Sequence, residues 1–428
     1  MATQRKFTFK FPNLAYGEMP ILGYVEPQMY RDDANKGFDV SVGEAFDDLQ
    51  ASGINTLLDV NYFMNEGDDE TVAKIMDECA LRHMNFLFKD RLAIVDRTPE
   101  EAAAYFKKTY ERFAHNPAFA GLHVIDEPGY VDWEKFGRLK EGFKKAWPDK
   151  LFYINLLQVY APHWAFSNGA VYDFEKGGGL PDDPDYHKYY QSYIDVAKPE
   201  IFSYDHYPCE GEFPALRGDY FEQLSLAHNY AKKGGVPIFS FVQVCTFGNQ
   251  SRLVSEGELK WQVNTALAYG SKGIAYFCYW NPFDLPHWRQ AMIDVKGNKS
   301  VQYYRIQRIN TYIRAVDEYL MNSDFVGYMN FGETPNGEKL QECDRIEKFG
   351  KLAYAEGGNF FVGCFERETG EKVYYVVNNS ITSSASLQLH FNERVEATLV
   401  CRDLSFKLKN DTFKLELGVG DAVLVVTR

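Results

Sequence analysis

Short apolar runs alternate along the chain with longer segments in which apolar residues recur at every third or fourth position. The short runs have the length of buried strands, and the periodic segments are typical of amphipathic helices. The expected strands cover residues 21–25, 54–58, 84–88, 119–128, 151–155, 200–204, 237–242 and 273–278. The expected helices cover residues 44–51, 70–83, 98–113, 132–146, 186–197, 220–233, 256–268 and 301–320. Eight strand–helix units over about 300 residues predict an α/β fold, a (β/α)8 TIM barrel, at residues 1–322.

The pattern changes after residue 322, where runs that alternate between apolar and polar residues replace the helical periodicity. These runs cover residues 359–365, 372–377, 385–389, 397–400 and 421–426. Turn signals such as Thr369-Gly370 and Asn378-Asn379 separate them. We therefore predict a second, all-β domain at residues 323–428. We expect it to fold as a β-sandwich that supports the barrel and holds no catalytic residue.

Polar side chains stand at nearly every C-terminal end of the expected barrel strands. Carboxylates occupy five of the eight ends. In TIM barrels these ends meet at one rim, where active sites lie. The residues are Glu26, Asp59, Asp90, Arg91, Asp126, Glu127, Asn155, Asp205, His206, Tyr207, Gln243, Trp280 and Asn281. Carboxylates combined with Trp and Tyr are typical of glycoside chemistry, in which acids move protons and aromatic faces hold the sugar ring.

The fourth expected strand carries the strongest candidate. Its apolar run stops at two adjacent carboxylates, Asp126 and Glu127, and Pro128 then ends any regular structure. Neighbouring acids are costly to bury together, which favours a functional interpretation. Glu127 would then be a general acid whose pKa is raised by Asp126 beside it. The alternative is that both acids cap the helix that begins near residue 132.

A long segment without clear periodicity, residues 158–184, follows the fifth expected strand. Loops of this length are usually functional or disordered, and its aromatic residues argue against disorder. We predict that Tyr160 and Trp164 from this segment line a sugar-binding cleft together with Trp280. For Trp280 the alternative is packing in the core.

Composition excludes several functional classes. The net charge is −14 and there is no basic run, which argues against nucleic acid and anionic membranes as partners. No apolar stretch reaches membrane-spanning length. The seven cysteines show no CxxC spacing and the nine histidines are scattered, so we expect no metal site and no cofactor. The absence of an apolar signal core predicts a cytoplasmic protein, or an exported one whose signal has been removed.

The chain resembles the clan of (β/α)8 retaining glycoside hydrolases that includes the family 42 β-galactosidases. The similarity rests on Glu127 at the end of strand four, on the strand-eight passage 266–280, and on the run 293–297 before a Tyr-rich helix. It implies an acid/base Glu127 and a carbohydrate substrate. The clan has Asn before the acid/base, where this chain has Asp126. Its nucleophile is a Glu that ends strand seven, where this chain has Gln243.

Three hypotheses accommodate the missing nucleophile. In the first, which we favour, Asp205 is the second catalytic carboxylate and Gln243 hydrogen-bonds the sugar or Asp205. In the second, Asp126 and Glu127 act as the adjacent Asp-Glu pair of substrate-assisted N-acetylhexosaminidases. In the third, the barrel binds carbohydrate without catalysis. The further substrate-binding candidates are Glu26, Asp59, Asn155, Tyr160, Trp164, His206, Tyr207 and Trp280. Sugar, linkage, anomeric outcome and oligomeric state remain open.

Overall fold

The computed structural model describes residues 7–30, 37–60, 69–169, 185–246, 252–282, 288–335, 340, 344–401 and 404–428. Eight parallel strands form a closed barrel in chain order, with β1 paired to both β2 and β8. They are β1 (Ile21–Tyr24), β2 (Thr56–Leu58), β3 (Asn85–Phe88), β4 (Phe119–Asp126), β5 (Leu151–Leu156), β6 (Phe202–Tyr204), β7 (Ile238–Gln243) and β8 (Gly273–Phe277). The predicted fold class is confirmed.

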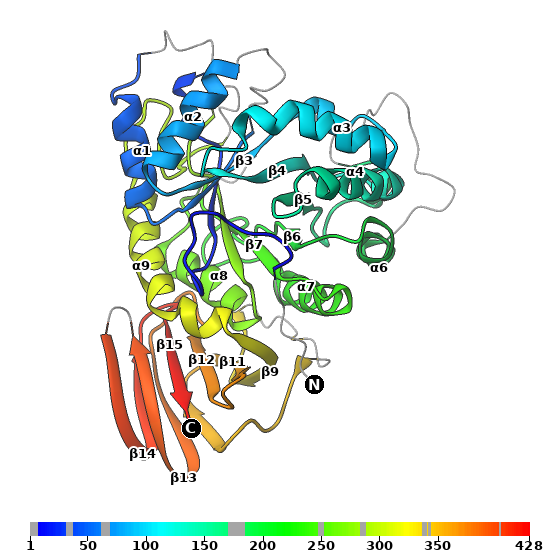
Figure 1. The fold of residues 1–428 in the computed structure, drawn as a ribbon. Helices are drawn as coiled ribbons and strands as arrows, with labels where there is room; N and C mark the ends of the chain where they lie inside the picture. Colours follow the sequence, from blue (N-terminus) through cyan, green and yellow to red (C-terminus); the bar gives the residue numbers. More distant parts are fainter. Residues whose placement is uncertain are drawn as a thin grey trace.

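Helices surround this barrel, as Figure 1 shows. They are α1 (Val42–Ala51), α2 (Asp69–Leu81), α3 (Pro99–Tyr110), α4 (Trp133–Ala146), α5 (His163–Asn168), α6 (Tyr186–Ser192), α7 (Tyr220–Gly234), α8 (Glu256–Ala268) and α9 (Val301–Met321). The start predicted for α3 is confirmed, because Thr98 and Glu101 form a reciprocal capping box and Pro99 is the first helical residue. The short helix α5 was not predicted, and residues 170–184 of the same long segment lie outside the described residues.

Seven antiparallel strands follow α9 and form one continuous sheet in the order β10-β13-β15-β12-β11-β9, with β14 paired to β13. They are β9 (Ser323–Phe331), β10 (Leu352–Gly357), β11 (Phe360–Arg367), β12 (Lys372–Asn378), β13 (Ala385–Cys401), β14 (Leu404–Leu417) and β15 (Ala422–Thr427). The sheet folds over so that the rings of Phe391 and Tyr374 meet across its interior, with centroids 5.6 Å apart. A separate apolar core fills this interior.

Two details of the β domain differ from the sequence prediction. Residues 385–389 and 397–400 belong to one strand, β13, which continues through a register shift between His390 and Val395. Strands β9, β10 and β14 were not predicted. Strand β14 begins with an alternation of apolar and polar residues, at Leu404, Phe406 and Leu408, that was a usable signal for a strand, although both faces of this half are exposed.

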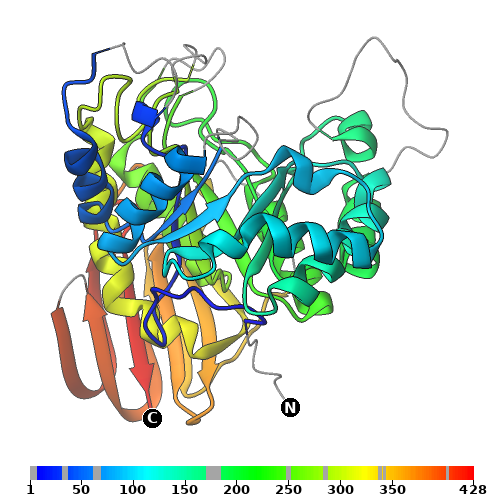
Figure 2. The same cartoon turned by 45° about the horizontal axis from the view of Figure 1, so that its top comes forward.

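The β domain packs against the outer faces of α7, α8 and α9, and both views place it beside α9 (Figures 1 and 2). The indole Nε1 of Trp261 in α8 donates to Asn379 Oδ1 at 2.8 Å. Tyr375 donates its hydroxyl to Asn264 Oδ1 of the same helix, also at 2.8 Å. The barrel core continues through this interface into one face of the β sheet. The interface therefore uses helix surfaces rather than the C-terminal ends of the barrel strands.

Candidate active site

A cavity of about 230 Å³ lies at the C-terminal ends of the barrel strands. Residues from six of the eight strand ends contribute to it, together with one tryptophan from the segment after β8. The lining residues are Tyr24, Asp126, Glu127, Asn155, Asp205, Tyr207, Phe241, Phe277 and Trp288. The structure thus brings together five of the side chains predicted from the sequence, which are Asp126, Glu127, Asn155, Asp205 and Tyr207.

Glu127 sits in a strained turn at the end of β4. Its φ of 47° lies in the left-handed region, which is unfavourable for a residue with a side chain. The backbone N–H of Glu127 donates to the carbonyl of Asn155 at 2.9 Å, and Pro128 forms an isolated bridge with Gly169. The hydroxyl of Tyr189 donates to the carbonyl of Pro128 at 2.8 Å. These contacts from β5, α5 and α6 hold the turn and direct the carboxyl group into the cavity.

Glu127 and Asp205 share a hydrogen bond between their carboxyl groups. Burial, the charges of Asp205 and Asp126, and this hydrogen bond raise the pKa of Glu127 well above its ordinary value. Burial and the charge of Asp126 also raise the pKa of Asp205, to about 7, although hydrogen bonds from Tyr207 and Glu127 oppose the shift. In this pair Glu127 carries the proton and donates it, and the Asp205 carboxylate accepts.

Asn155 links the third acid to this pair. Its Nδ2 donates to Asp126 Oδ1 at 3.1 Å and to Asp205 Oδ1 at 3.3 Å. Its Oδ1 accepts from Ser203 Oγ at 2.9 Å, and Ser203 is itself 2.6 Å from the hydroxyl of Tyr153. This chain fixes the amide so that its donors face the carboxylates. The Tyr24 hydroxyl donates to the other oxygen of Asp126 at 2.9 Å.

The side chain of Gln243 makes different contacts from those expected. Its side chain is fully buried and bonds to the backbone of Cys209, accepting from the N–H at 2.9 Å and donating to the carbonyl at 3.3 Å. The loop after β6, which follows Asp205, is therefore tied to the end of β7 through the Gln243 amide. The expected contact of Gln243 with sugar or with Asp205 is replaced by this structural role.

Three further candidates are buried outside the cavity lining. The Glu26 carboxylate accepts the backbone N–H of Val60 at 3.0 Å, and Asp59 accepts that of Lys89 at 3.0 Å. The Nε2 of His206 lies 2.7 Å from Asp219, and burial lowers the pKa of this imidazole. These side chains hold the loops after β1, β2 and β6 rather than a ligand in the cavity.

The prediction that Tyr160, Trp164 and Trp280 line a sugar-binding cleft also needs correction. The indole of Trp280 is fully buried and packs edge-on against Phe38, with ring centroids 6.1 Å apart, so it belongs to the core. Trp164 lies in α5, where it is half-buried and packs against the barrel core. Tyr160 accepts the backbone N–H of Tyr207 at 3.3 Å and so positions a lining residue from behind.

Four lining residues were missed by the sequence analysis: Tyr24, Phe241, Phe277 and Trp288. Three of them lie within β1, β7 and β8, two or three positions before the strand ends that were considered. Alternation along a strand, which returns every second side chain to the barrel interior, was a usable signal for them. Trp288 follows a segment without strand periodicity, so the sequence offered no signal for its position.

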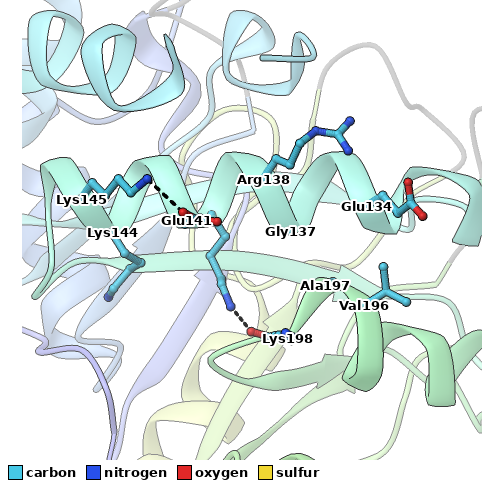
Figure 3. Close-up of a pocket in the computed structure, with 10 residues that line it drawn as sticks. Glu134, Gly137, Arg138, Glu141, Lys144, Lys145, Val196, Ala197 and Lys198 are labelled. Atoms are coloured by element: carbon cyan, nitrogen blue, oxygen red, sulfur yellow. Dashed lines mark hydrogen bonds and ion pairs between the residues drawn. The ribbon is translucent and has the colours of Figure 1, made fainter. Parts of the chain in front are cut away.

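A larger groove of about 720 Å³ lies outside the barrel, between α4 and the turn that ends at Lys198 (Figure 3). Three of its basic side chains are paired with acids, and the ammonium group of Lys140 donates to the carbonyl of Lys198. The ion pairs are Arg138–Asp96, Lys144–Glu200 and Lys145–Glu141. Because most of these basic groups already have partners and the strand ends that carry the predicted acids line the smaller cavity, we place the candidate active site at that cavity.

Within the described part of the chain, no group of three or more His, Cys, Asp or Glu side chains is arranged to hold a metal ion. The acids of the cavity bond instead to one another and to Tyr24, Asn155 and Tyr207. Among the same described residues, no helix combines the length and apolar character needed to cross a membrane.

Comparison with protein-family profiles and with curated protein sequences finds no match. Solved structures share the fold at low identity. A β-galactosidase from Bacillus circulans sp. alkalophilus is 8% identical, with a TM-score of 0.61 over 96% of this chain and 99% of that chain. A family 42 β-galactosidase from G. stearothermophilus is 9% identical, with a TM-score of 0.59 over 99% and 100%. A family 5 glycoside hydrolase from Bacteroides vulgatus is 12% identical, with a TM-score of 0.52 over 96% and 89%.

Proposed function

We propose that the chain is a glycoside hydrolase in which Glu127 is the general acid and Asp205 is the second catalytic carboxylate. The observation that carries this proposal is that the carboxyl groups of Glu127 and Asp205 line one cavity at the C-terminal ends of the strands, where burial and the neighbouring acids raise the pKa of both. Glycoside hydrolysis needs one carboxylic acid and one carboxylate flanking the scissile bond. The fold shared with β-galactosidases and a family 5 hydrolase supports the same reaction class.

The proposed reaction follows the retaining course. Glu127 protonates the glycosidic oxygen of the leaving group while Asp205 attacks the anomeric carbon, which leaves a glycosyl ester on Asp205. Glu127, now ionised, takes a proton from the water that hydrolyses this ester and returns to its starting state. Retaining enzymes hold the two carboxyl groups about 5–5.5 Å apart and inverting enzymes about 6.5–9.5 Å. Because Glu127 and Asp205 line the same small cavity, we propose the shorter separation.

A second candidate is the substrate-assisted mechanism, in which the acetamide of an N-acetylated sugar attacks and Asp126 orients it. It is favoured by one observation, that Asp126 lines the same cavity beside Glu127. The two mechanisms differ in the carboxylate they require. In the first, Asp205→Asn abolishes turnover and Asp126→Asn reduces it, whereas in the second the order is reversed and only N-acetylated sugars are cleaved.

The test is a hydrolysis screen on a glycan panel and on aryl glycosides, with the anomer of the product followed by NMR. Glu127→Gln should lower kcat/KM by about 10²–10⁴-fold without loss of folding, because it removes general acid catalysis. Glu134→Gln, in the outer groove, is the matched control and should keep wild-type activity. If Glu127→Gln retained more than half of the activity, the assignment would be wrong.

The pH dependence gives an independent check of the pair. The active form needs Asp205 ionised and Glu127 protonated. Because the pKa of Asp205 is raised to about 7, the acid limb of kcat/KM should fall near pH 7, and the raised pKa of Glu127 sets the alkaline limb. The alkaline limb should disappear from the profile of an aryl glycoside whose leaving group needs no proton. An acid limb near pH 4 would contradict the coupling of the two carboxyl groups.

A further inference from the structure

The cavity is unusual in the balance of its charges. Its described lining comprises three acids, one amide and five aromatic residues, and no lysine or arginine. Buried charges are normally compensated by a partner of opposite sign. Among the described residues, the hydrogen bonds that these acids accept from outside the trio come from neutral donors, which are the Tyr24 hydroxyl, the Asn155 amide and the Tyr207 hydroxyl.

Two basic side chains near the cavity, Arg217 and His123, do not line it. Arg217 lies over the outer face of the Tyr160 ring, 3.7 Å from its centroid, and pairs with Glu210 at 2.7 Å. His123, whose ring lies 5.8 Å from that of Tyr24, is held neutral because burial and the charge of Lys89 lower its pKa to about 3. The described lining of the cavity thus combines three acids with no basic side chain, which suits a cationic ligand.

We infer that the cavity binds an amino sugar, and this inference rests on the proposed function. The ligand would be a single pyranose ring whose protonated amine pairs with Asp126. The volume of about 230 Å³ is below the ~300–1,000 Å³ of sites for drug-sized ligands, which suits one ring. The rings of Tyr24, Tyr207, Phe241, Phe277 and Trp288 give that sugar its apolar faces, and aromatic faces also attract a cation.

The position of Asp126 indicates where the amine lies on the sugar. Asp126 precedes Glu127 in the chain and shares the Asn155 amide with Asp205, so it adjoins both reacting groups. A substituent on the carbon next to the anomeric centre is the one that reaches it. Both oxygens of Asp126 already act as acceptors, which suits a substituent that only donates. The same reasoning predicts that uronic acids and sulfated sugars are rejected by charge repulsion.

Binding to the intact protein tests this inference without the need for turnover. D-glucosamine, D-galactosamine and D-mannosamine are titrated by calorimetry at pH 7, each against its parent hexose, with D-glucuronate as the anionic probe. At least one amino sugar should bind about tenfold or more tighter than its parent, as expected for a charge-assisted hydrogen bond, and D-glucuronate should bind weakest. In Asp126→Asn the preference for the amine should fall to about twofold or less.

Asp132→Asn, a surface change in the turn after Glu127, is the matched control and should keep the full preference. Parent hexoses that bind as tightly as the amino sugars would overturn the inference, and so would an unchanged preference in Asp126→Asn or the absence of any binding. Hydrolysis of the corresponding aryl glycosides separates this failure from that of the proposed function. If neutral glycosides are cleaved in a way that depends on Glu127 and aryl glucosaminides are not preferred, only the inference about the amino sugar is refuted. No cleavage of any glycoside refutes the proposed function.

Discussion

At the scale of single residues, burial of the Asp205 carboxyl group in the candidate site lowers the free energy of unfolding. A carboxyl group whose pKa is higher in the folded than in the unfolded state destabilises the fold once the unfolded chain ionises. For Asp205 the folded value is about 7, against an ordinary value of about 3.9. The penalty is therefore absent below about pH 4, grows as the pH rises to about 7, and is constant above it.

Asp205→Asn should accordingly stabilise the protein while it removes activity. The gain should be about 1–3 kcal/mol at pH 8, because the amide has no charge to bury, and should become small near pH 4. Urea unfolding at both pH values measures it. Asp219→Asn serves as a control, because the pKa of Asp219 is lowered by its bond to His206 and its loss should destabilise the fold at pH 8. A gain for Asp205→Asn that did not change with pH would have another origin.

At the scale of elements, the turn after β4 is positioned by close backbone packing. Gly169, with φ of 88°, follows α5 and faces this turn. A Cβ at Gly169 would lie 2.9 Å from the Glu127 carbonyl and 3.0 Å from the Gly129 nitrogen. Neither backbone atom can rotate away as a side chain would, so α5 and the turn have to separate if this glycine gains a side chain.

Gly169→Ala should therefore displace Glu127 and lower kcat/KM by about 10- to 100-fold on an active substrate. Gly370→Ala is the matched control, since Gly370 also has positive φ, 84°, but nothing lies within 4 Å of its Cβ. Both variants carry backbone strain of about 1 kcal/mol, and only Gly169→Ala should lose activity. Equal kinetics in the two variants would show that the turn tolerates the shift.

The hydrogen bonds between Gln243 and the backbone of Cys209 also act between elements, because they join the end of β7 to the loop after β6. Gln243→Glu restores the carboxylate that the resembling clan uses but loses the donor to the Cys209 carbonyl. We expect a loss of about 1–3 kcal/mol in stability and no gain in activity, because the side chain does not line the cavity. Kinetics and urea unfolding together measure this. Increased turnover would instead identify position 243 as a nucleophile site.

These elements also show what the sequence could and could not reveal. The strand periodicity located Asp126, Glu127, Asn155 and Asp205, because acids and amides that end apolar runs are unusual and a barrel gathers strand ends at one rim. The hydrogen-bond partners were not predictable. Gln243 and Glu26 stand at strand ends of the same kind, yet their side chains turn to backbone groups of adjacent loops, and loop conformation is not encoded in periodicity. Trp280 was misplaced for another reason, because periodicity does not distinguish an aromatic ring that packs in the core from one that lines a cleft.

At the scale of the whole molecule, the barrel and the β domain share one core. Aromatic rings from both domains stack at the interface, with the Phe221 and Phe361 centroids 5.8 Å apart and those of Tyr269 and Phe361 5.1 Å apart. Gly363 of β11 makes this approach possible, because a Cβ there would lie 2.2 Å from the Ala268 carbonyl at the end of α8. A shared core of this kind predicts that the two domains unfold together.

Gly363→Ala should therefore destabilise both domains at once, by about 1–3 kcal/mol or more, because its methyl group meets backbone in a packed interface. The domains can be followed separately. All six tryptophans precede residue 322, so their fluorescence reports on the barrel, while amide exchange of β12 and β15 reports on the β domain. Both signals should move to the same lower urea midpoint. Gly218→Ala, with nothing within 4 Å of its Cβ, should leave both midpoints unchanged. Two separated transitions in the wild-type protein would show that the domains are energetically independent.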